Sequence, residues 1–390
     1  MTQFITRAAV AAFAALATLV PAAPATAADG SVTVYLGTYT RKDKSKGIYT
    51  AKLDLAKGTL GDLKVAAEIE NPSYLALASS NKFLYAIGEV SSFQGKKGGV
   101  ISAFSVEPDG TLKLLNQQST VGPGPCYVSV DNAGKIAMIA NYGGGSVAAY
   151  PIAPDGKLGE ASAFIQHPKD EAAAAATKGK GLPRAHSINL DRANRFAFAA
   201  DLGLNKIFVY KLNPETAGLT PHDPPAAKVA DGAGPRHFAF TPDGRYAYVI
   251  NELNMTMTAF TYNGEKGVLT EVQTISTLPA GESKAAGQST AHVDVHPSGK
   301  FVYGSNRGHD TIVCYAIDPA TGKLTLVGHT PTGGKTPRNF GIDPTGQYLL
   351  AANQGTDNVV VFKIDQATGK LTETGSKIEV GAPVCVKFVK

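Results

Sequence analysis

The stretch G-P-R-H-F-A-F-T-P-D-G-R-Y-A-Y-V-I-N-E, residues 234–252, decides how this chain folds. Two runs rich in aromatic and β-branched residues, 236–241 and 246–250, have the composition of β-strands. Between them lies P-D-G-R, in which proline presets a turn dihedral and glycine supplies a positive φ. The stretch is therefore predicted to form an antiparallel hairpin with Arg236 and Glu252 at the same end.

Both halves of this hairpin recur along the chain. Tripeptides similar to Gly-Pro-Arg have central residues that are 53, 60, 50, 56, 46 and 46 residues apart. The seven tripeptides begin at Asn71, Gly124, Arg184, Gly234, Thr290, Thr336 and Ala382. The seven second strands are expected at Val32–Gly37, Phe83–Gly88, Ile136–Asn141, Phe196–Asp201, Tyr246–Asn251, Phe301–Asn306 and Tyr348–Asn353. A period of this length indicates a repeat architecture.

The two ends of the repeat are complementary. The hairpin at the beginning of the chain is incomplete, because no first strand precedes the second strand at Val32–Gly37. The hairpin at the end of the chain is also incomplete, because the first strand after the tripeptide at Ala382 is not followed by a second strand. A third strand and a fourth segment follow each hairpin, and helical periodicity is nearly absent outside one short helix expected at Asp170–Lys178. We therefore predict an all-β fold, a seven-bladed β-propeller with four-stranded blades. Residues 31–390 form its single domain, closed by pairing the C-terminal strand with the N-terminal strands in one blade.

The first 27 residues are predicted to be a signal peptide. Arg7 precedes an apolar run, 8–20, that is too short to span a bilayer, and Ala25-Thr26-Ala27 has the pattern of a cleavage site. Cleavage is expected after Ala27, giving a periplasmic or secreted protein without a membrane anchor.

Composition excludes several classes of function. The formal net charge is +5, but the lysine-rich spots are separated, so nucleic-acid binding is not expected. The three cysteines, Cys126, Cys314 and Cys385, lie in apolar runs and are predicted to be buried free thiols. No C-x-x-C pair or G-x-S-x-G elbow is present, so neither a zinc site nor a serine hydrolase is predicted.

Chemically diverse residues are expected at one end of the central channel only. The hairpin turns at the other end are proline–glycine turns, for which a structural role suffices. At the diverse end, first strands begin and second strands finish. The candidates there are His186, Arg236, His292 and Arg338 from first strands, and Asn141, Tyr142, Asp201, Glu252, Arg307, Asn353 and Gln354 from second strands. Charges gathered in one concavity indicate a ligand site. The alternative is a set of salt bridges between blades, such as Arg236 with Glu252.

Motifs across the whole predicted domain resemble one known family. These are Y-L-G-T-Y-T at 35–40, N-P-S-Y-L-A-L at 71–77, N-Y-G-G-G-S-V at 141–147, A-H-S-I at 185–188, A-D-L-G at 200–203, the stretch at 234–252, S-N-R-G at 305–308 and T-P-R-N-F at 336–340. In this combination they resemble the propeller-type lactonase family. That family includes the bacterial propeller form of 6-phosphogluconolactonase and the fungal carboxy-cis,cis-muconate cycloisomerase.

The resemblance implies a metal-free site without a cofactor, whose catalytic residues match His186, Arg236, Glu252 and Arg307. Two positions depart from the family pattern, because many members have histidine where Arg184 stands and an acidic residue where His292 stands. Asn141, Tyr142, Asp201, His292, Arg338, Asn353 and Gln354 are then candidates for substrate binding. Both departures change the charge at the site, so they bear on the substrate and on activity.

The leading hypothesis is therefore a carboxylic ester hydrolase that opens a sugar lactone. Its substrate would be 6-phosphogluconolactone by family analogy, or an unphosphorylated aldonolactone given export. His186 or Glu252 would activate water and the other would supply a proton, while Arg236 and Arg307 would bind the oxyanion or a carboxylate. The alternatives are a muconate lactonising isomerase and a non-catalytic ligand- or protein-binding propeller. A monomer or weak dimer is expected.

Overall fold

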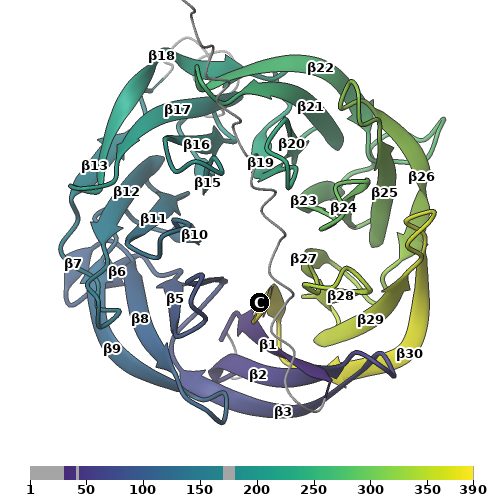
Figure 1. Ribbon diagram of the computed structural model, residues 1–390, viewed down its shortest axis with the longest axis horizontal. Helices are drawn as coiled ribbons and strands as arrows, with labels where there is room; N and C mark the ends of the chain where they lie inside the picture. The colour runs from purple at the N-terminus through teal and green to yellow at the C-terminus, as the bar shows by residue number, and fades with distance from the viewer. Residues whose placement is uncertain (1–29, 41–43, 170–180, 390) are drawn as a thin grey trace, which may run out of the picture.

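The computed structural model describes residues 30–40, 44–169 and 181–389, in which seven four-stranded antiparallel sheets are arranged in a ring around a central axis (Figure 1). The predicted all-β, seven-bladed propeller is confirmed. The predicted signal peptide, residues 1–27, and the helix expected at 170–178 lie outside the described residues. Among the residues described, none forms a helix that is long and apolar enough to cross a membrane.

The first and second strands of the blades lie nearest the channel. The seven first strands are β31 (Pro383–Phe388), β4 (Tyr74–Leu77), β10 (Pro125–Val130), β15 (Ala185–Leu190), β19 (Pro235–Phe240), β23 (Ser289–Val295) and β27 (Pro337–Ile342). The seven second strands are β1 (Ser31–Thr38), β5 (Phe83–Gly88), β11 (Ile136–Asn141), β16 (Phe196–Asp201), β20 (Tyr246–Asn251), β24 (Phe301–Arg307) and β28 (Tyr348–Asn353). Second strands are buried almost throughout, which explains their continuous apolar character.

The third and fourth strands form the outer part of each blade. The third strands are β2 (Gly47–Asp54), β8 (Val100–Val106), β12 (Ser146–Pro151), β17 (Lys206–Asn213), β21 (Thr256–Asn263), β25 (Thr311–Ile317) and β29 (Asn358–Ile364). The fourth strands are β3 (Thr59–Glu68), β9 (Leu112–Ser119), β13 (Ala163–Gln166), β18 (Gly218–Lys228), β22 (Val268–Ser276), β26 (Leu324–Pro331) and β30 (Leu371–Glu379). A two-stranded hairpin, β6 (Ser92–Phe93) with β7 (Lys96–Lys97), lies in the loop between β5 and β8.

The predicted closure of the ring, by pairing of the C-terminal strand with the N-terminal strands, is confirmed. In the closing blade the order is β3-β2-β1-β31, so the first strand comes from the end of the chain and the other three from its beginning. Val34 pairs with Phe388 and Leu36 with Val386 in an antiparallel register. Closure pairs β31 with β1, so the last strand of the chain completes the blade that the first three strands begin.

Tyrosine hydroxyls join neighbouring blades at a repeated position. The hydroxyls of Tyr35, Tyr85, Tyr248 and Tyr303 donate to glycine carbonyls in the turn between the third and fourth strands of the next blade, at 2.8–3.0 Å. One of these glycines, Gly156, has a φ of +84°, and a Cβ there would lie 2.2 Å from the ring of Phe83. Each buried hydrogen bond of this kind contributes about 1 kcal/mol, so the blades are fixed to one another through the turns.

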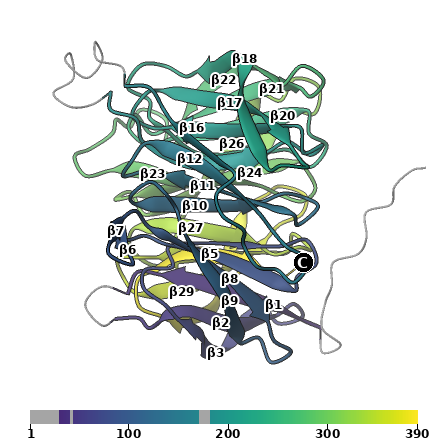
Figure 2. The same cartoon turned by 90° about the vertical axis from the view of Figure 1, so that its left-hand side faces the viewer.

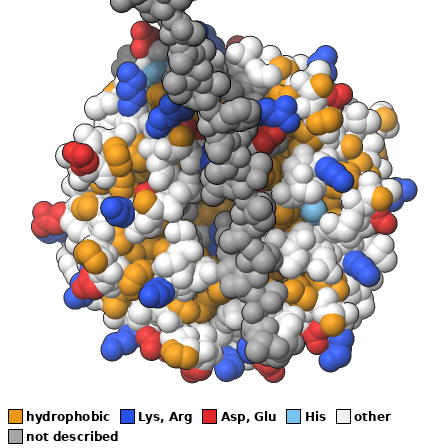
Figure 3. Space-filling view, in the orientation of Figure 1, with side chains coloured by type: hydrophobic (Ala, Val, Ile, Leu, Met, Phe, Trp, Pro, Cys, Tyr) orange, Lys and Arg blue, Asp and Glu red, His pale blue; other side chains and the backbone are white. Residues whose placement is uncertain are grey.

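The two faces of the disc differ in what they carry. Loops between second and third strands lie on one face, where the β6–β7 hairpin projects at the left of Figure 2. Turns between first and second strands lie on the other, together with the carboxyl end of β31 at the right of Figure 2. We call these the loop face and the turn face. Figure 3 shows the turn face, on which lysine and arginine side chains are spread out rather than gathered into a patch.

Candidate active site

In six of the seven blades a β-bulge turns one side chain of the first strand toward the loop-face end of the channel, and Ser73, just before β4, takes the equivalent position in the seventh. In the blade of β19 and β20, Pro235 pairs with Asn251 and His237 pairs with Ile250. Arg236 lies between them and has no residue opposite it on β20. Bulges re-aim side chains in this way. This bulge requires glycine at position 234, because Gly234 has a φ of +67° and a Cβ there would lie 2.5 Å from the side chain of Leu253. The residues at the equivalent position, which we call the bulge ring, are Ser73, Cys126, His186, Arg236, Ala291, Arg338 and Val384.

A second ring comes from the ends of the second strands. The backbone N–H of Glu252 donates to the carbonyl of Gly234, and that of Gln354 donates to Thr336 in the same way. This bond places each residue beside the bulge of its own blade. The equivalent residues, which we call the exit ring, are Tyr39, Glu89, Tyr142, Leu202, Glu252, Arg307 and Gln354. The bulge ring and the exit ring together form the loop-face end of the channel, which we call the mouth.

Glu252 is held between two arginines at the mouth. Its Oε2 accepts from Nε of Arg236 at 2.8 Å and lies 2.9 Å from Nη2 of Arg307. Burial alone would raise the pKa of Glu252, but the charges of Arg236, Arg307 and Arg338 outweigh it and lower that pKa. Glu252 is therefore a carboxylate at neutral pH. Within the described residues no hydrogen bond reaches its Oε1, so that oxygen is available to a ligand or a water molecule.

His186 joins this group from the neighbouring blade. It is only 5% exposed, its ring meets that of Tyr142 edge-on at 5.2 Å, and its Nδ1 lies 3.6 Å from Sγ of Cys126. Burial lowers the pKa of His186 well below 6.5, and the charges of Arg236, Arg338 and Arg307 lower it further. His186 is therefore neutral at pH 7. The mouth thus presents a carboxylate and a neutral imidazole, both in the form that accepts a proton.

A second polar cluster lies across the mouth. Oε2 of Glu89 accepts from the hydroxyls of Ser73 at 2.5 Å and Tyr39 at 2.7 Å. The Tyr39 hydroxyl accepts in turn from Nη2 of Arg338 at 3.0 Å, and the guanidinium of Arg338 lies 5.4 Å from the centre of the Tyr39 ring. Arg338, Glu89, Tyr39 and Ser73 line a hollow of ≈10 Å³, about the room for one water molecule, with His186 and Arg236. Arg236, Arg338 and Glu89 line this hollow, and Glu252 and Arg307 lie beside Arg236 at the same end of the channel, which favours an anionic or polarised ligand.

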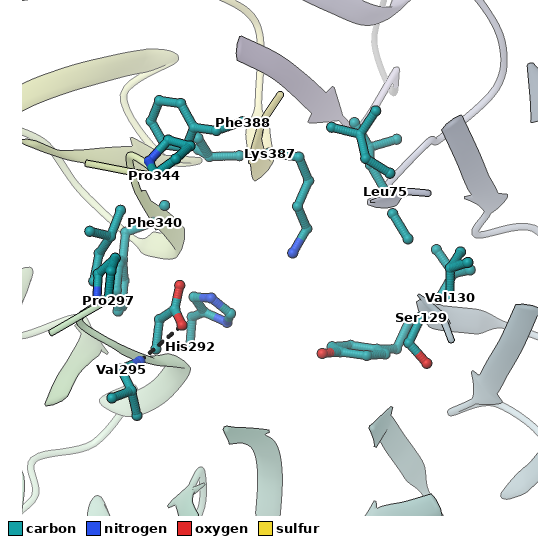
Figure 4. A pocket seen from close by; sticks show the side chains of 18 residues that line it. Leu75, Ser129, Val130, His292, Val295, Pro297, Phe340, Pro344, Lys387 and Phe388 are labelled. Atoms are coloured by element: carbon teal, nitrogen blue, oxygen red, sulfur yellow. Dashed lines mark hydrogen bonds between the residues drawn. The ribbon is translucent and has the colours of Figure 1, made fainter. Parts of the chain in front are cut away.

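A layer of buried side chains separates the mouth from the turn-face end of the channel. It consists of the residues that follow the bulges, and none of them is more than 7% exposed. These residues, which we call the plug, are Tyr74, Tyr127, Ser187, His237, His292, Asn339 and Cys385. Below the plug lies a cavity of ≈410 Å³, into which Lys387 projects from β31 and His292 from β23 (Figure 4). The channel is therefore two separate hollows rather than one pore.

Three of the predicted site residues brace the blades instead of facing the mouth. Nδ2 of Asn141 donates to the Thr120 carbonyl, and Nδ2 of Asn353 donates to the Thr332 carbonyl. Asp201 accepts from Nδ1 of His167 at 2.6 Å and from the backbone N–H of Arg184. All three side chains are completely buried. They end second strands one residue before the exit ring, and we call them, with Asn251 and Asn306 at the same position, the bracing residues.

His292 lies in the plug and not at the mouth. The tripeptide Thr290-Ala291-His292 invites alignment with Gly-Pro-Arg, but Thr290 pairs with Asn306 as Pro235 pairs with Asn251. The bulge position of this blade is therefore Ala291, and His292 lies one layer deeper. It lines the turn-face cavity and packs edge-on against Phe340 at 4.9 Å. A difference of one residue in register accounts for its different placement.

Comparisons with known proteins agree with this geometry. Residues 33–388 match the family described as "Lactonase, 7-bladed beta-propeller". This chain belongs to that family. A 6-phosphogluconolactonase of Bacillus subtilis (strain 168) is 38% identical over 305 residues, which cover 76% of this chain and 81% of the relative.

Two solved structures resemble this lactonase-family chain over nearly all of their length. A protein of Bacteroides fragilis proposed to be a 6-phosphogluconolactonase is 37% identical with a TM-score of 0.83, covering 94% of this chain and 100% of that one. A periplasmic gluconolactonase of Pseudomonas aeruginosa is 32% identical with a TM-score of 0.85, covering 92% and 99%. Both names describe those proteins, and together with the family they support lactone hydrolysis as the class of reaction.

Two residues of the lactonase mouth could have been found from the sequence. Glu89 ends a second strand at the position that Glu252 occupies, and Tyr39 lies in the Y-L-G-T-Y-T motif. Tyr142 and Gln354 were predicted and do belong to the exit ring, half-buried at the mouth. Within the described residues no cluster of three or more potential metal ligands is found, and the expectation of a metal-free site remains a prediction.

Proposed function

We propose that the mouth hydrolyses a sugar lactone. The observation that carries this proposal is the carboxylate of Glu252 held between Arg236 and Arg307, with the neutral imidazole of His186 lining the mouth beside Arg236. Lactone opening needs a base for water, donors for the oxyanion, and a proton for the departing ring oxygen. These four residues supply each of those functions without a further group.

The reaction can be written with the proton accounted for at each step. A water molecule attacks the lactone carbonyl and gives a proton to Glu252 or His186, the two groups that are unprotonated at neutral pH. Arg236 and Arg307 stabilise the oxyanion of the tetrahedral intermediate, because a guanidinium donates hydrogen bonds and keeps its charge. The intermediate collapses, the bond from the carbonyl carbon to the ring oxygen breaks, and the base returns its proton to that oxygen. The product is an open-chain hydroxy acid.

We further propose that the physiological substrate is an unphosphorylated aldonolactone outside the cytoplasm. A phosphorylated intermediate of cytosolic metabolism would be scarce there, and the predicted cleavage after Ala27 supports export. The periplasmic gluconolactonase of Pseudomonas aeruginosa is similar over 92% of this chain, which supports the same location. Sequencing the amino terminus of the protein from a periplasmic fraction tests this, with Ala28 as the expected first residue.

The mouth is proposed to bind a small lactone or its carboxylate product, with no role in binding nucleic acid or membranes. Arg338, Tyr142 and Gln354 are the proposed binding residues, with Tyr39 and Glu89 added from the second cluster. Asn141, Asp201 and Asn353 are left out because they brace the blades, and His292 because it lies in the plug. A monomer or weak dimer is proposed, since each mouth is built from one chain.

A substrate panel tests the proposed function. Proton release would be followed with gluconolactone, 6-phosphogluconolactone and a carboxymuconolactone, each against its spontaneous rate. We expect the highest kcat/KM with gluconolactone. A preference for the phosphorylated lactone would overturn the substrate but not the reaction. Turnover of the muconolactone alone would indicate the isomerase, and no turnover of any lactone would favour a binding module.

A further inference from the structure

Two histidines of the plug, His237 and His292, form a hydrogen-bonded chain beneath Arg236. Nη1 of Arg236 lies 3.2 Å from Nε2 of His237, and Nδ1 of His237 lies 2.7 Å from Nδ1 of His292. The two imidazole rings meet nearly at right angles, 5.0 Å apart. They come from neighbouring blades, β19 and β23, so the chain crosses the blade interface under the proposed catalytic group. Both side chains are buried, at 3% and 6% exposure.

The donors and acceptors in this chain can be assigned from chemistry. A guanidinium nitrogen only donates, so Nε2 of His237 accepts. A neutral His237 then has its proton on Nδ1 and donates to Nδ1 of His292. His292 in turn has its proton on Nε2, on the side of the turn-face cavity. Burial lowers the pKa of His237 well below 6.5, and the charges of Arg236 and the two neighbouring histidines add to this. Burial also lowers the pKa of His292 well below 6.5, with Lys387 and Arg236 contributing.

The N–H groups of Arg236 are divided between the protein and the mouth. Nε donates to Glu252, and Nη1 donates to the Ala291 carbonyl at 2.6 Å and to His237. Within the described residues no hydrogen bond from Nη2 is found. Three of the five N–H groups therefore fix the plane of the guanidinium, and the two on Nη2 remain for a ligand.

We propose that His237 and His292 are positioning residues, which hold the guanidinium of Arg236 so that its Nη2 faces the lactone carbonyl. His237 supplies the acceptor, and His292 fixes the tautomer that makes His237 an acceptor. The catalytic effect of this role rests on the proposed function. The tautomers of His237 and His292 are inferred from their hydrogen bonds alone. A pair that only filled space would need neither a fixed tautomer nor an acceptor beneath Arg236.

A double-mutant cycle tests the catalytic part. His237→Phe keeps a ring but leaves Nη1 with an unmatched donor, and we expect kcat/KM to fall about tenfold or more, mainly through kcat. His237→Gln provides an amide oxygen near the position of Nε2 and should recover most of that loss. In an Arg236→Lys background, which lacks the planar fork, His237→Phe should cost little more, because the two changes remove the same interaction. Additive effects, or a Gln variant no better than the Phe variant, would overturn the proposal.

A buried histidine outside the mouth provides the matched control. His296 is 2% exposed and bonds Ser298 and the Gly346 carbonyl on the turn face. His296→Gln should lower the melting temperature without changing kcat/KM of the folded enzyme. Melting curves of all variants separate loss of fold from loss of rate.

A second measurement needs neither activity nor a variant that folds. Nitrogen-15 chemical shifts of the imidazoles in the parent protein report the tautomer and charge of each histidine. We expect neutral rings at pH 7, with the proton of His237 on Nδ1 and that of His292 on Nε2. A protonated ring, or His237 with its proton on Nε2, would overturn the proposal. If the parent opened no lactone, the proposed function would fail while these shifts still decided the hydrogen-bonded chain.

Discussion

Asn251 and Glu252 are neighbours at the end of one strand, yet they belong to different parts of the protein. Asn251 is completely buried, and its Nδ2 donates to Thr256 and Thr258 within the blade. Glu252 faces the mouth and contacts Arg236 and Arg307 from two blades. The same division separates a bracing residue from an exit-ring residue in five of the seven blades. Side chains that stabilise the scaffold and side chains that face a ligand are thus one residue apart, and only the strand register distinguishes them.

The largest difference between the two classes should appear at Glu252. Glu252→Gln removes the carboxylate while keeping an acceptor for the arginines, and we expect kcat/KM with gluconolactone to fall by at least about a hundredfold. The protein should remain folded, with a loss of about 1–3 kcal/mol because the buried Arg236 and the partly buried Arg307 lose their counter-charge. Initial rates of proton release and thermal melts measure the two effects. A variant as active as the parent would remove Glu252 from the mechanism.

The bracing position should show the opposite pattern. Asn353→Ala removes hydrogen bonds to Thr332 and Asn358, and the buried acceptors left behind should cost about 1–3 kcal/mol of unfolding free energy. kcat/KM of the folded variant should be unchanged. Denaturant unfolding and lactone kinetics on the same preparation make the comparison, and a selective loss of rate would return Asn353 to the candidate binding residues.

Acidity should separate stability from activity in the same way. His186, His237 and His292 are buried in the neutral form, so the unfolded chain binds more protons than the folded chain below pH 6.5, and stability falls as the pH falls. The lowered pKa of Glu252 adds to this loss below 4.5. kcat/KM, by contrast, should hold until well below pH 6.5, because both candidate bases remain unprotonated. Melting temperature and rate measured across this range test the prediction, which an acid limb of kcat/KM near pH 6.5 would contradict.

The smallest effect is expected on the turn face. Asp243 lies in the P-D-G-R turn and pairs with Arg245, and both side chains are about half exposed. Asp243→Asn should change the unfolding free energy by no more than about 0.5 kcal/mol, because exposed ion pairs contribute little. kcat/KM should not change. A loss of activity here would mean that the turn face communicates with the mouth.

The fold could be predicted from the sequence because its signals are repeated and local. Proline–glycine turns, alternation of strand residues and complementary ends each occur several times, so one ambiguous blade does not alter the result. The mouth was predicted less completely. His186, Arg236, Glu252 and Arg307 stand at the expected end of the channel, but whether Asn353 or Gln354 faces it depends on a bulge of one residue. A bulge depends on backbone geometry, such as the φ of +67° at Gly234, which spacing alone does not reveal.

His292 illustrates the same limit. Its blade lacks the proline that precedes the bulge position in five of the other six blades, so its tripeptide can be aligned in two ways that differ by one residue. The pairing of Thr290 with Asn306 decides between them. The hydrogen bond from His237 to His292 joins blades whose contact residues are 55 positions apart, and no local pattern predicts such a contact.

The closing blade also determines on which face of the disc a fusion partner or a solid support can be attached. β1 begins on the turn face, and β31 ends there, so Ser31 and Phe388 both lie on the side of the disc opposite the mouth (Figure 2). A tether or a fusion partner joined next to Ser31 or Phe388 would therefore lie on the turn face. The mouth of an enzyme immobilised in this way would still face the solution. Coupling through the β6–β7 hairpin, by contrast, would turn that open side toward the support.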